Sequence, residues 1–176
     1  MPERIVDTPV DADVPDIPEI LHQVLSWCLD DARQRMEAGE EITPFTALVA
    51  GDTLFTEEHV ADEPDECYEL ACQTVAHAQG AATYVFCYDG YINLETEMLD
   101  AIVAEGGMPG EESGHAIGLV YSVGDDGTIE FAQDPVYLGE APNFMAELDP
   151  NDIAADFESF DESQQAAQSA EADAAE

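Results

Sequence analysis

The sequence contains no lysine, and its 176 residues include only three arginines against 41 aspartates and glutamates, which gives a formal net charge of −38. P-loop nucleotide binding, Schiff-base catalysis and Ser–Lys dyads all require a lysine, so the sequence excludes these three chemistries. Direct binding of DNA or RNA is also disfavoured, because affinity for a phosphate backbone depends on lysine and arginine. The same shortage of cations argues against anionic membrane surfaces and highly phosphorylated substrates.

Long apolar segments are missing as well, since no apolar run reaches the roughly 18 residues of a membrane span. The amino-terminal segment MPERIVDTPVDADVPD lacks the basic and apolar regions of a secretion signal. We therefore expect a cytoplasmic protein. The cysteines contain no Cys-x-x-Cys pair, so we expect reduced, mostly buried thiols at Cys28, Cys67, Cys72 and Cys87.

The apolar content, in contrast, is sufficient for a folded core. Hydrophobic residues make up 45% of the chain and include seven phenylalanines and six tyrosines. We expect a single domain over residues 15–160, after a disordered, acidic and proline-containing arm at 1–14. The segment 161–176 is acidic, low in complexity and without large apolar residues, which predicts a disordered tail.

Apolar residues at helical spacing predict two main helices. The first runs from Asp16 to about Ala38 and ends at Gly39, with Arg33 and Arg35 near its carboxyl end. The second opens in the acidic, proline-containing segment 62–65 and ends at Gly80. The predicted buried face of the second helix consists of Cys67, Leu70, Ala71, Val75 and Ala78.

Segments rich in β-branched and aromatic residues predict the strands. Residues 43–50 and 53–57 are separated by Gly51-Asp52, which is a common two-residue hairpin loop. Segment 82–89 has apolar residues on both faces, which indicates a strand in the middle of the sheet. The remaining predicted strands are 98–105, whose apolar run alone does not separate strand from helix, 115–123 and 128–132.

The predicted fold class is therefore α+β: an antiparallel sheet of about five to six strands with two main helices and a short C-terminal helix, in the order α-β-β-α-β-β-β-β-α. This element order is similar to that of the roadblock and longin-like folds, which serve as dimerising platforms, but no sequence motif accompanies the similarity. The short helix begins at Asp149-Pro150 and carries Ile153, Phe157 and Phe160. These three residues must pack on this chain or on a partner, so they are candidate partner contacts.

Cys87, Asp89 and His115 are the residue types of a thiol enzyme, since they supply a nucleophile, an acid and a base. A cysteine in an alternating strand is ordinarily a small core residue, and surrounding negative charge would raise its pKa. We therefore expect no catalytic residue and keep these three as the alternative, a small thiol-dependent enzyme that uses Cys87.

Two acidic clusters contain ligands suitable for hard cations. One is Asp62, Asp65 and Glu66 at the start of the second helix, and the other is Asp125 and Asp126 in a turn. Neither has the ligand spacing of an EF-hand. Acidic residues favour helix N-termini and aspartates favour turns, so we expect no specific metal site, no cofactor and only non-specific cations around the surface.

The negative charge itself has more than one explanation. It can serve solubility, as in a saline or acidic-proteome host. Alternatively, the chain is a nucleic-acid mimic that inhibits a basic partner, with carboxylates where phosphates would lie. The expected function is that of a non-enzymatic cytoplasmic domain that acts through protein contacts, as a homodimer or an adaptor, without direct binding of nucleic acid or membrane.

Overall fold

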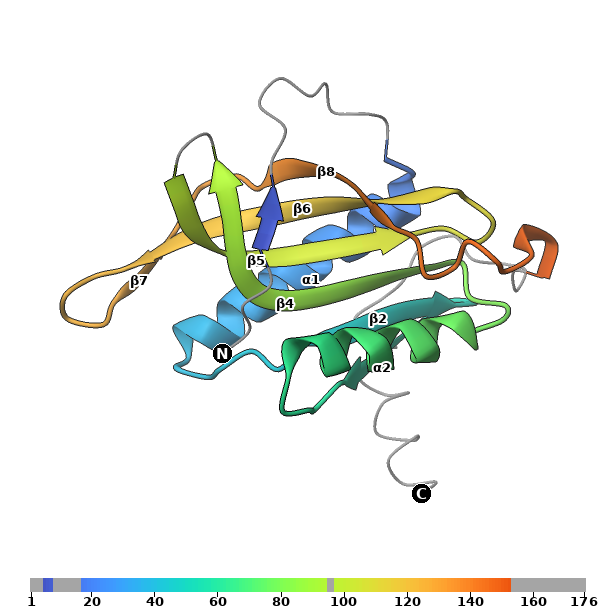
Figure 1. Cartoon of the computed structure of the whole chain (residues 1–176), viewed down its shortest axis with the longest axis horizontal. Helices are drawn as coiled ribbons and strands as arrows, with labels where there is room; N and C mark the ends of the chain where they lie inside the picture. Colours follow the sequence, from blue (N-terminus) through green and yellow to red (C-terminus); the bar gives the residue numbers. More distant parts are fainter. Residues whose placement is uncertain (1–4, 8–16, 95–96, 153–176) are drawn as a thin grey trace.

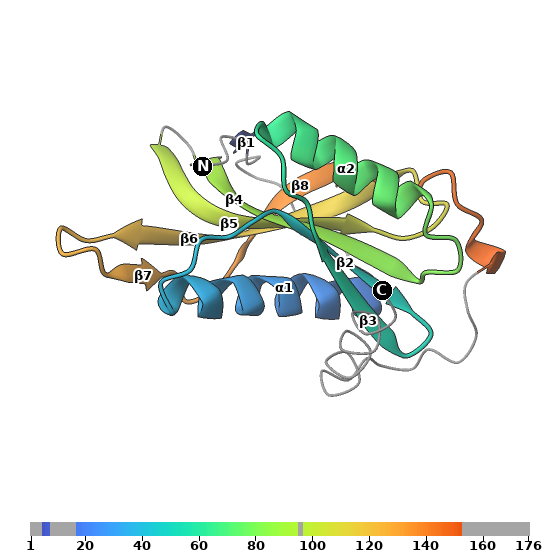
Figure 2. The ribbon, with the colours of Figure 1, turned by 90° about the horizontal axis from the view of Figure 1, so that it is seen from below.

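The structure is a computed structural model that describes residues 5–7, 17–94 and 97–152. In these ranges two helices, α1 (Glu19–Glu37) and α2 (Pro64–Ala76), lie on opposite faces of one eight-stranded sheet (Figure 1). Figure 2 shows the sheet edge-on between the two helices. The strands are β1 (Ile5–Asp7), β2 (Phe45–Ala50), β3 (Thr53–Glu58), β4 (Thr83–Leu94), β5 (Glu97–Gly107), β6 (Ser113–Val123), β7 (Ile129–Phe131) and β8 (Val136–Pro142).

The strand order is β3-β2-β4-β5-β6-β7, and every neighbouring pair on this path is antiparallel. β8 pairs antiparallel with β6, and β1 adds a short parallel pairing to the end of β4. β4 therefore lies between β2 and β5, which confirms its predicted central position. Its side chains alternate between two separate cores. Val85 and Cys87 pack on the α1 side, and the three aromatic residues Tyr84, Phe86 and Tyr88 pack on the α2 side.

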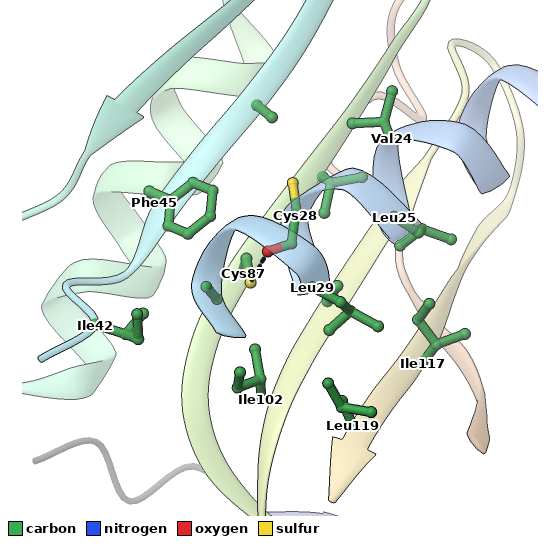
Figure 3. Close-up of a cluster of buried hydrophobic side chains, with 14 of the residues drawn as sticks. Val24, Leu25, Cys28, Leu29, Ile42, Phe45, Cys87, Ile102, Ile117 and Leu119 are labelled. Carbon is green, nitrogen blue, oxygen red and sulfur yellow. Dashed lines mark hydrogen bonds between the residues drawn. The ribbon is translucent and has the colours of Figure 1, made fainter. Parts of the chain in front are cut away.

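The core on the α1 side is mainly aliphatic. α1 turns an apolar stripe toward the sheet, where Leu25 and Cys28 are fully buried against residues such as Ile102 of β5 (Figure 3). The helix ends as its sequence predicts: Gly39 has a φ of 88°, and the Glu40 N–H donates to the Arg35 carbonyl at 2.9 Å, which closes the last turn.

The core on the α2 side is aromatic and partly polar. Tyr84 stacks on Phe144 with ring centroids 5.1 Å apart. The Tyr84 hydroxyl accepts a hydrogen bond from the Phe144 N–H at 2.9 Å and donates one to the Pro142 carbonyl at 3.2 Å. Glu105 is buried on the same face, where the Tyr88 hydroxyl donates to its Oε2 at 3.1 Å. Hydrogen bonds therefore accompany apolar packing on this side.

The α+β class and the antiparallel sheet are confirmed, but the strand count is eight rather than five to six. Segment 98–105 lies in strand β5, as expected. The structure adds β8, which the sequence did not predict as a strand. Gly139 and Pro142 disfavour strands in general, but both are tolerated at a sheet edge. It also adds β1, inside the segment 1–14 predicted to be disordered, where Ile5-Val6 has strand propensity.

Two further predictions concern the ends of helices. α1 begins at Glu19 after Pro18, so the helix starts later than the predicted Asp16. After the last described 3-10 turn, Pro150–Asp152, the predicted C-terminal helix with Ile153, Phe157 and Phe160 lies outside the described residues. The predicted tail 161–176 lies outside them as well.

Candidate functional site

A groove of about 540 Å³ lies between α2 and the segment that leads into it from β3. Its α2 wall is a single stripe, since positions 66, 69, 70 and 73 repeat at helical spacing and share one side of the helix. We name this feature the acidic groove. Its lining residues are Val60, Ala61, Asp62, Glu66, Glu69, Leu70 and Gln73.

A second cavity of about 120 Å³ shares Val60 and Ala61 with the acidic groove, so the two cavities meet at this segment. We name it the small hollow. Its walls come from the chain before β2, from the chain after β3 and from α2. Its other lining residues are Glu41, Ile42, Thr43, Pro44, His59 and Cys67.

Two apolar side chains of the acidic groove are left in solvent: Val60 is 78% exposed and Leu70 is 39% exposed. The prediction that Leu70 belongs to the buried face of the helix is therefore wrong. α2 buries the smaller residues Cys67, Ala71 and Val75, which follow one another at a spacing of four. Leu70 lies to the side of this stripe, so it faces the groove instead of the sheet.

His59 is buried beside the small hollow and connects three elements. Its Nε2 lies 3.0 Å from Thr46 Oγ1 of β2, and its Nδ1 lies 3.5 Å from Glu57 Oε2 of β3. The same Glu57 oxygen accepts a hydrogen bond from the Thr74 hydroxyl of α2 at 2.9 Å. Burial lowers the pKa of His59 although the Glu57 carboxylate opposes this, so the imidazole is neutral at neutral pH. These contacts hold the wall of the hollow in place.

The structure separates the five acidic residues that the sequence singled out. Asp62 and Glu66 line the acidic groove, whereas Asp65 does not. Asp125 and Asp126 lie in the turn between β6 and β7, where Asp126 Oδ1 accepts from the Thr128 N–H at 3.0 Å. This hydrogen bond lowers the pKa of Asp126 and identifies an ordinary turn contact. Across the described ranges, no group of three or more His, Cys, Asp or Glu side chains could hold a metal ion.

Cys87 lies in the aliphatic core beneath α1. Its side chain is fully buried, and its thiol approaches the Cys28 carbonyl at 3.9 Å (Figure 3). Burial raises the pKa of Cys87 far above that of a free thiol. A nucleophilic cysteine needs a lowered pKa and access to substrate, so this environment favours packing over catalysis.

Asp89 and His115 are held by other partners. The Tyr121 hydroxyl donates to Asp89 Oδ1 at 2.6 Å, and burial raises the pKa of Asp89. His115 Nδ1 lies 3.1 Å from the Tyr137 hydroxyl. In the strand register, His115 of β6 lies level with Val85 of β4, with β5 between them. The Cα atoms of His115 and Cys87 are therefore roughly 10 Å or more apart. The three residues therefore do not form one site.

Sequence reasoning missed His59 and the exposed position of Val60. No motif contains either residue, and the signal is only that both lie between a strand and the proline-containing start of a helix. The predicted contacts Ile153, Phe157 and Phe160 lie outside the described residues, so the acidic groove takes their place as the candidate interaction site.

No protein-family model, no curated protein and no solved structure matches the chain. The similarity of its element order to the roadblock and longin-like folds thus gains no support from known structures. Among the helices that the structure describes, none is both long and apolar enough to cross a membrane.

Proposed function

We propose that this chain is a non-enzymatic, cytoplasmic protein-interaction domain that binds a segment of a partner protein in the acidic groove. The observation that carries the proposal is the exposure of Val60, at 78%, beside exposed Leu70 in one groove. Single exposed apolar residues are common, but exposed apolar residues gathered in a polar-rimmed groove are typical of binding sites.

An adaptor role is favoured over a homodimer by charge. A second copy would bring a formal charge of −38 toward a groove that already carries Asp62, Glu66 and Glu69. Like charges brought together at an interface cost free energy, whereas a basic partner gains it. The occupant we propose is therefore a different protein.

Two further observations support the non-enzymatic and cytoplasmic parts of the proposal. The Cys87 thiol is buried, has a raised pKa and lies apart from His115, so the thiol-enzyme alternative lacks an assembled site. All four cysteines are free, which is compatible with a reducing compartment.

The test is a selection of peptides from a display library against the immobilised wild-type protein, followed by binding measurements with fluorescence anisotropy. Val60→Asp places a charge in the groove, and Val123→Asp is a matched control, because Val123 is a 56% exposed valine at the end of β6. We expect selected peptides to bind the wild type and Val123→Asp equally, and Val60→Asp at least about tenfold more weakly.

Three results would overturn the proposal. The library yields no binder, or the selected peptides bind Val60→Asp as well as the wild type. Alternatively, the wild type self-associates in sedimentation and Val60→Asp does not, which assigns the groove to a second copy.

A further inference from the structure

The acidic groove and the small hollow are two compartments that meet at one short segment. Val60 and Ala61 line both of them. A partner segment that crosses Val60 therefore places neighbouring side chains in two different environments. The chemistry of these environments determines which side chains the partner presents.

The larger compartment is negatively charged, and neither arginine of the described residues lines it. Its three carboxylates belong to Asp62, Glu66 and Glu69. The two arginines in the described part of the chain are engaged elsewhere, on carboxylates of α1 and on Glu58. Covering carboxylates with an uncharged or acidic segment costs their hydration, whereas a lysine or arginine compensates for it.

The small hollow differs in both size and polarity. Ile42, Pro44 and Cys67 contribute apolar walls, and the buried His59 is uncharged at neutral pH. The other polar members of the lining are the exposed Glu41 and the half-buried Thr43, so the hollow carries one carboxylate against three in the acidic groove. A volume of about 120 Å³ is somewhat smaller than a cavity of about 150 Å³ that binds benzene. The hollow therefore suits one aliphatic side chain better than the larger indole ring.

We infer that the partner segment carries a basic residue that occupies the acidic groove and, next to it, an aliphatic residue that anchors in the small hollow. This inference rests on the proposed function and specifies its partner. The chain itself does not fit the role of occupant well, because residues 161–176 contain no lysine or arginine and a second copy is strongly negative.

The experiment uses peptides from the selection above, each with its basic residue changed to Gln or its aliphatic residue changed to Ala or Trp. Protein variants are Glu66→Gln with Glu69→Gln, and the matched control is Glu130→Gln on β7. We expect the change of the basic residue to weaken binding about fivefold or more in the wild type and in Glu130→Gln, but little in the double variant. Both changes of the aliphatic residue weaken binding to the wild type.

A labelling experiment locates the anchor. Cys67 lines the small hollow and is only 4% exposed, so its alkylation is slow in the free protein and the peptide should slow it further, while the half-buried Cys72, which lines neither cavity, keeps its rate. Mass spectrometry of the alkylated protein separates the two sites.

The outcomes separate the inference from the proposal on which it rests. The inference fails and the interaction domain stands if peptides bind in a Val60-dependent way but lack the basic and aliphatic pair. The same holds if changing the basic residue of the peptide weakens binding to the double variant as much as it weakens binding to the wild type. If the peptide slows both cysteines equally, the anchor is not in the small hollow. If no peptide depends on Val60, both fail.

Discussion

Helix α1 spans 19 residues and buries seven of them against the sheet, whereas α2 spans 13 and buries the small side chains of Cys67, Ala71 and Val75. The α1 face is a closed, mainly aliphatic core. The α2 face contains aromatic rings, hydrogen-bonded hydroxyls and the buried Glu105, and its helix keeps a second stripe free to line the acidic groove.

The two helices therefore differ in how much of their surface the sheet covers. A long helix whose apolar stripe matches the sheet buries most of its apolar side chains, so α1 contributes mainly to the free energy of folding. A short helix packed through small residues leaves other side chains available, so the role proposed for α2 would cost the core little. Four predictions test this difference: the first three compare positions on the two sides of the sheet, and the fourth compares two positions within α2.

The largest effect is expected for Leu25→Ala in α1. Leu25 is fully buried, so the variant loses apolar burial and leaves a cavity, and the free energy of unfolding should fall by about 2–5 kcal/mol. Leu70→Ala in α2 should cost less than about 1 kcal/mol, because Leu70 is partly exposed. Urea unfolding measures both. Equal losses would show that α2 contributes to the core as α1 does.

The second prediction concerns hydrogen bonds on the α2 face. Tyr84→Phe leaves the Phe144 N–H and the Pro142 carbonyl without their partner, so the free energy of unfolding should fall by about 1–3 kcal/mol. Tyr137→Phe is the control, because its hydroxyl is only partly buried beside His115 and water can replace it. If both variants lose the same free energy of unfolding, the hydrogen bonds of the Tyr84 hydroxyl contribute no more to stability than the partly exposed contact of Tyr137.

The third prediction is that acidification changes the contributions of His59 and Asp89 to the free energy of unfolding in opposite directions. Burial lowers the pKa of His59 below its ordinary 6.5, so the unfolded chain binds more protons and stability is lost as the pH falls from 6.5 toward the folded pKa. Burial raises the pKa of Asp89 above 3.8, so its ionisation costs stability as the pH rises through the folded pKa.

Chemical unfolding between about pH 7 and about pH 4 measures these contributions in variants that do not titrate. His59→Gln should lose less stability on acidification than the wild type. Asp89→Asn should gain less stability on acidification than the wild type, because only the wild type has a buried carboxylate at this position that acid can neutralise. Identical pH profiles for all three proteins would refute the assignment of the two groups.

The smallest effect is expected within the acidic groove. Glu66 and Glu69 are three residues apart on α2, so Glu69→Gln relieves repulsion and should raise the free energy of unfolding by about 0.2–0.5 kcal/mol. Asp65→Asn should lower it by about 0.3–1 kcal/mol, because Asp65 favours the first turn and does not line the groove. A loss of stability in Glu69→Gln would mean that this carboxylate serves the fold.

Sequence alone was sufficient where local pattern decides the structure. The period of α1, the Gly51-Asp52 hairpin and the alternation of β4 are all local, and the structure confirms them. β8 is defined by pairing with β6 rather than by its own composition, so it was missed. Helical spacing placed Leu70 on an apolar face but could not show how far the sheet extends beneath α2.

The candidate site was less predictable for the same reason. His59 gains its role from Thr46, Glu57 and the neighbouring α2, which only the fold brings together. The sequence did single out Asp62 and Glu66, yet only as candidate cation ligands and without the exposed Val60 on which the proposed function rests. A cluster of charged residues in the sequence identifies a region of the chain, but what that region could bind depends on the side chains that the fold places around it.

The carboxylates of the acidic groove also have a consequence for the rate of complex formation. Their attraction extends about 8–10 Å into solvent at moderate ionic strength, so it would guide the proposed basic segment before any contact is made. Apolar contacts with Val60 and the small hollow act only after contact and determine how long the complex lasts. For the proposed basic partner, added salt should therefore slow association far more than it speeds release.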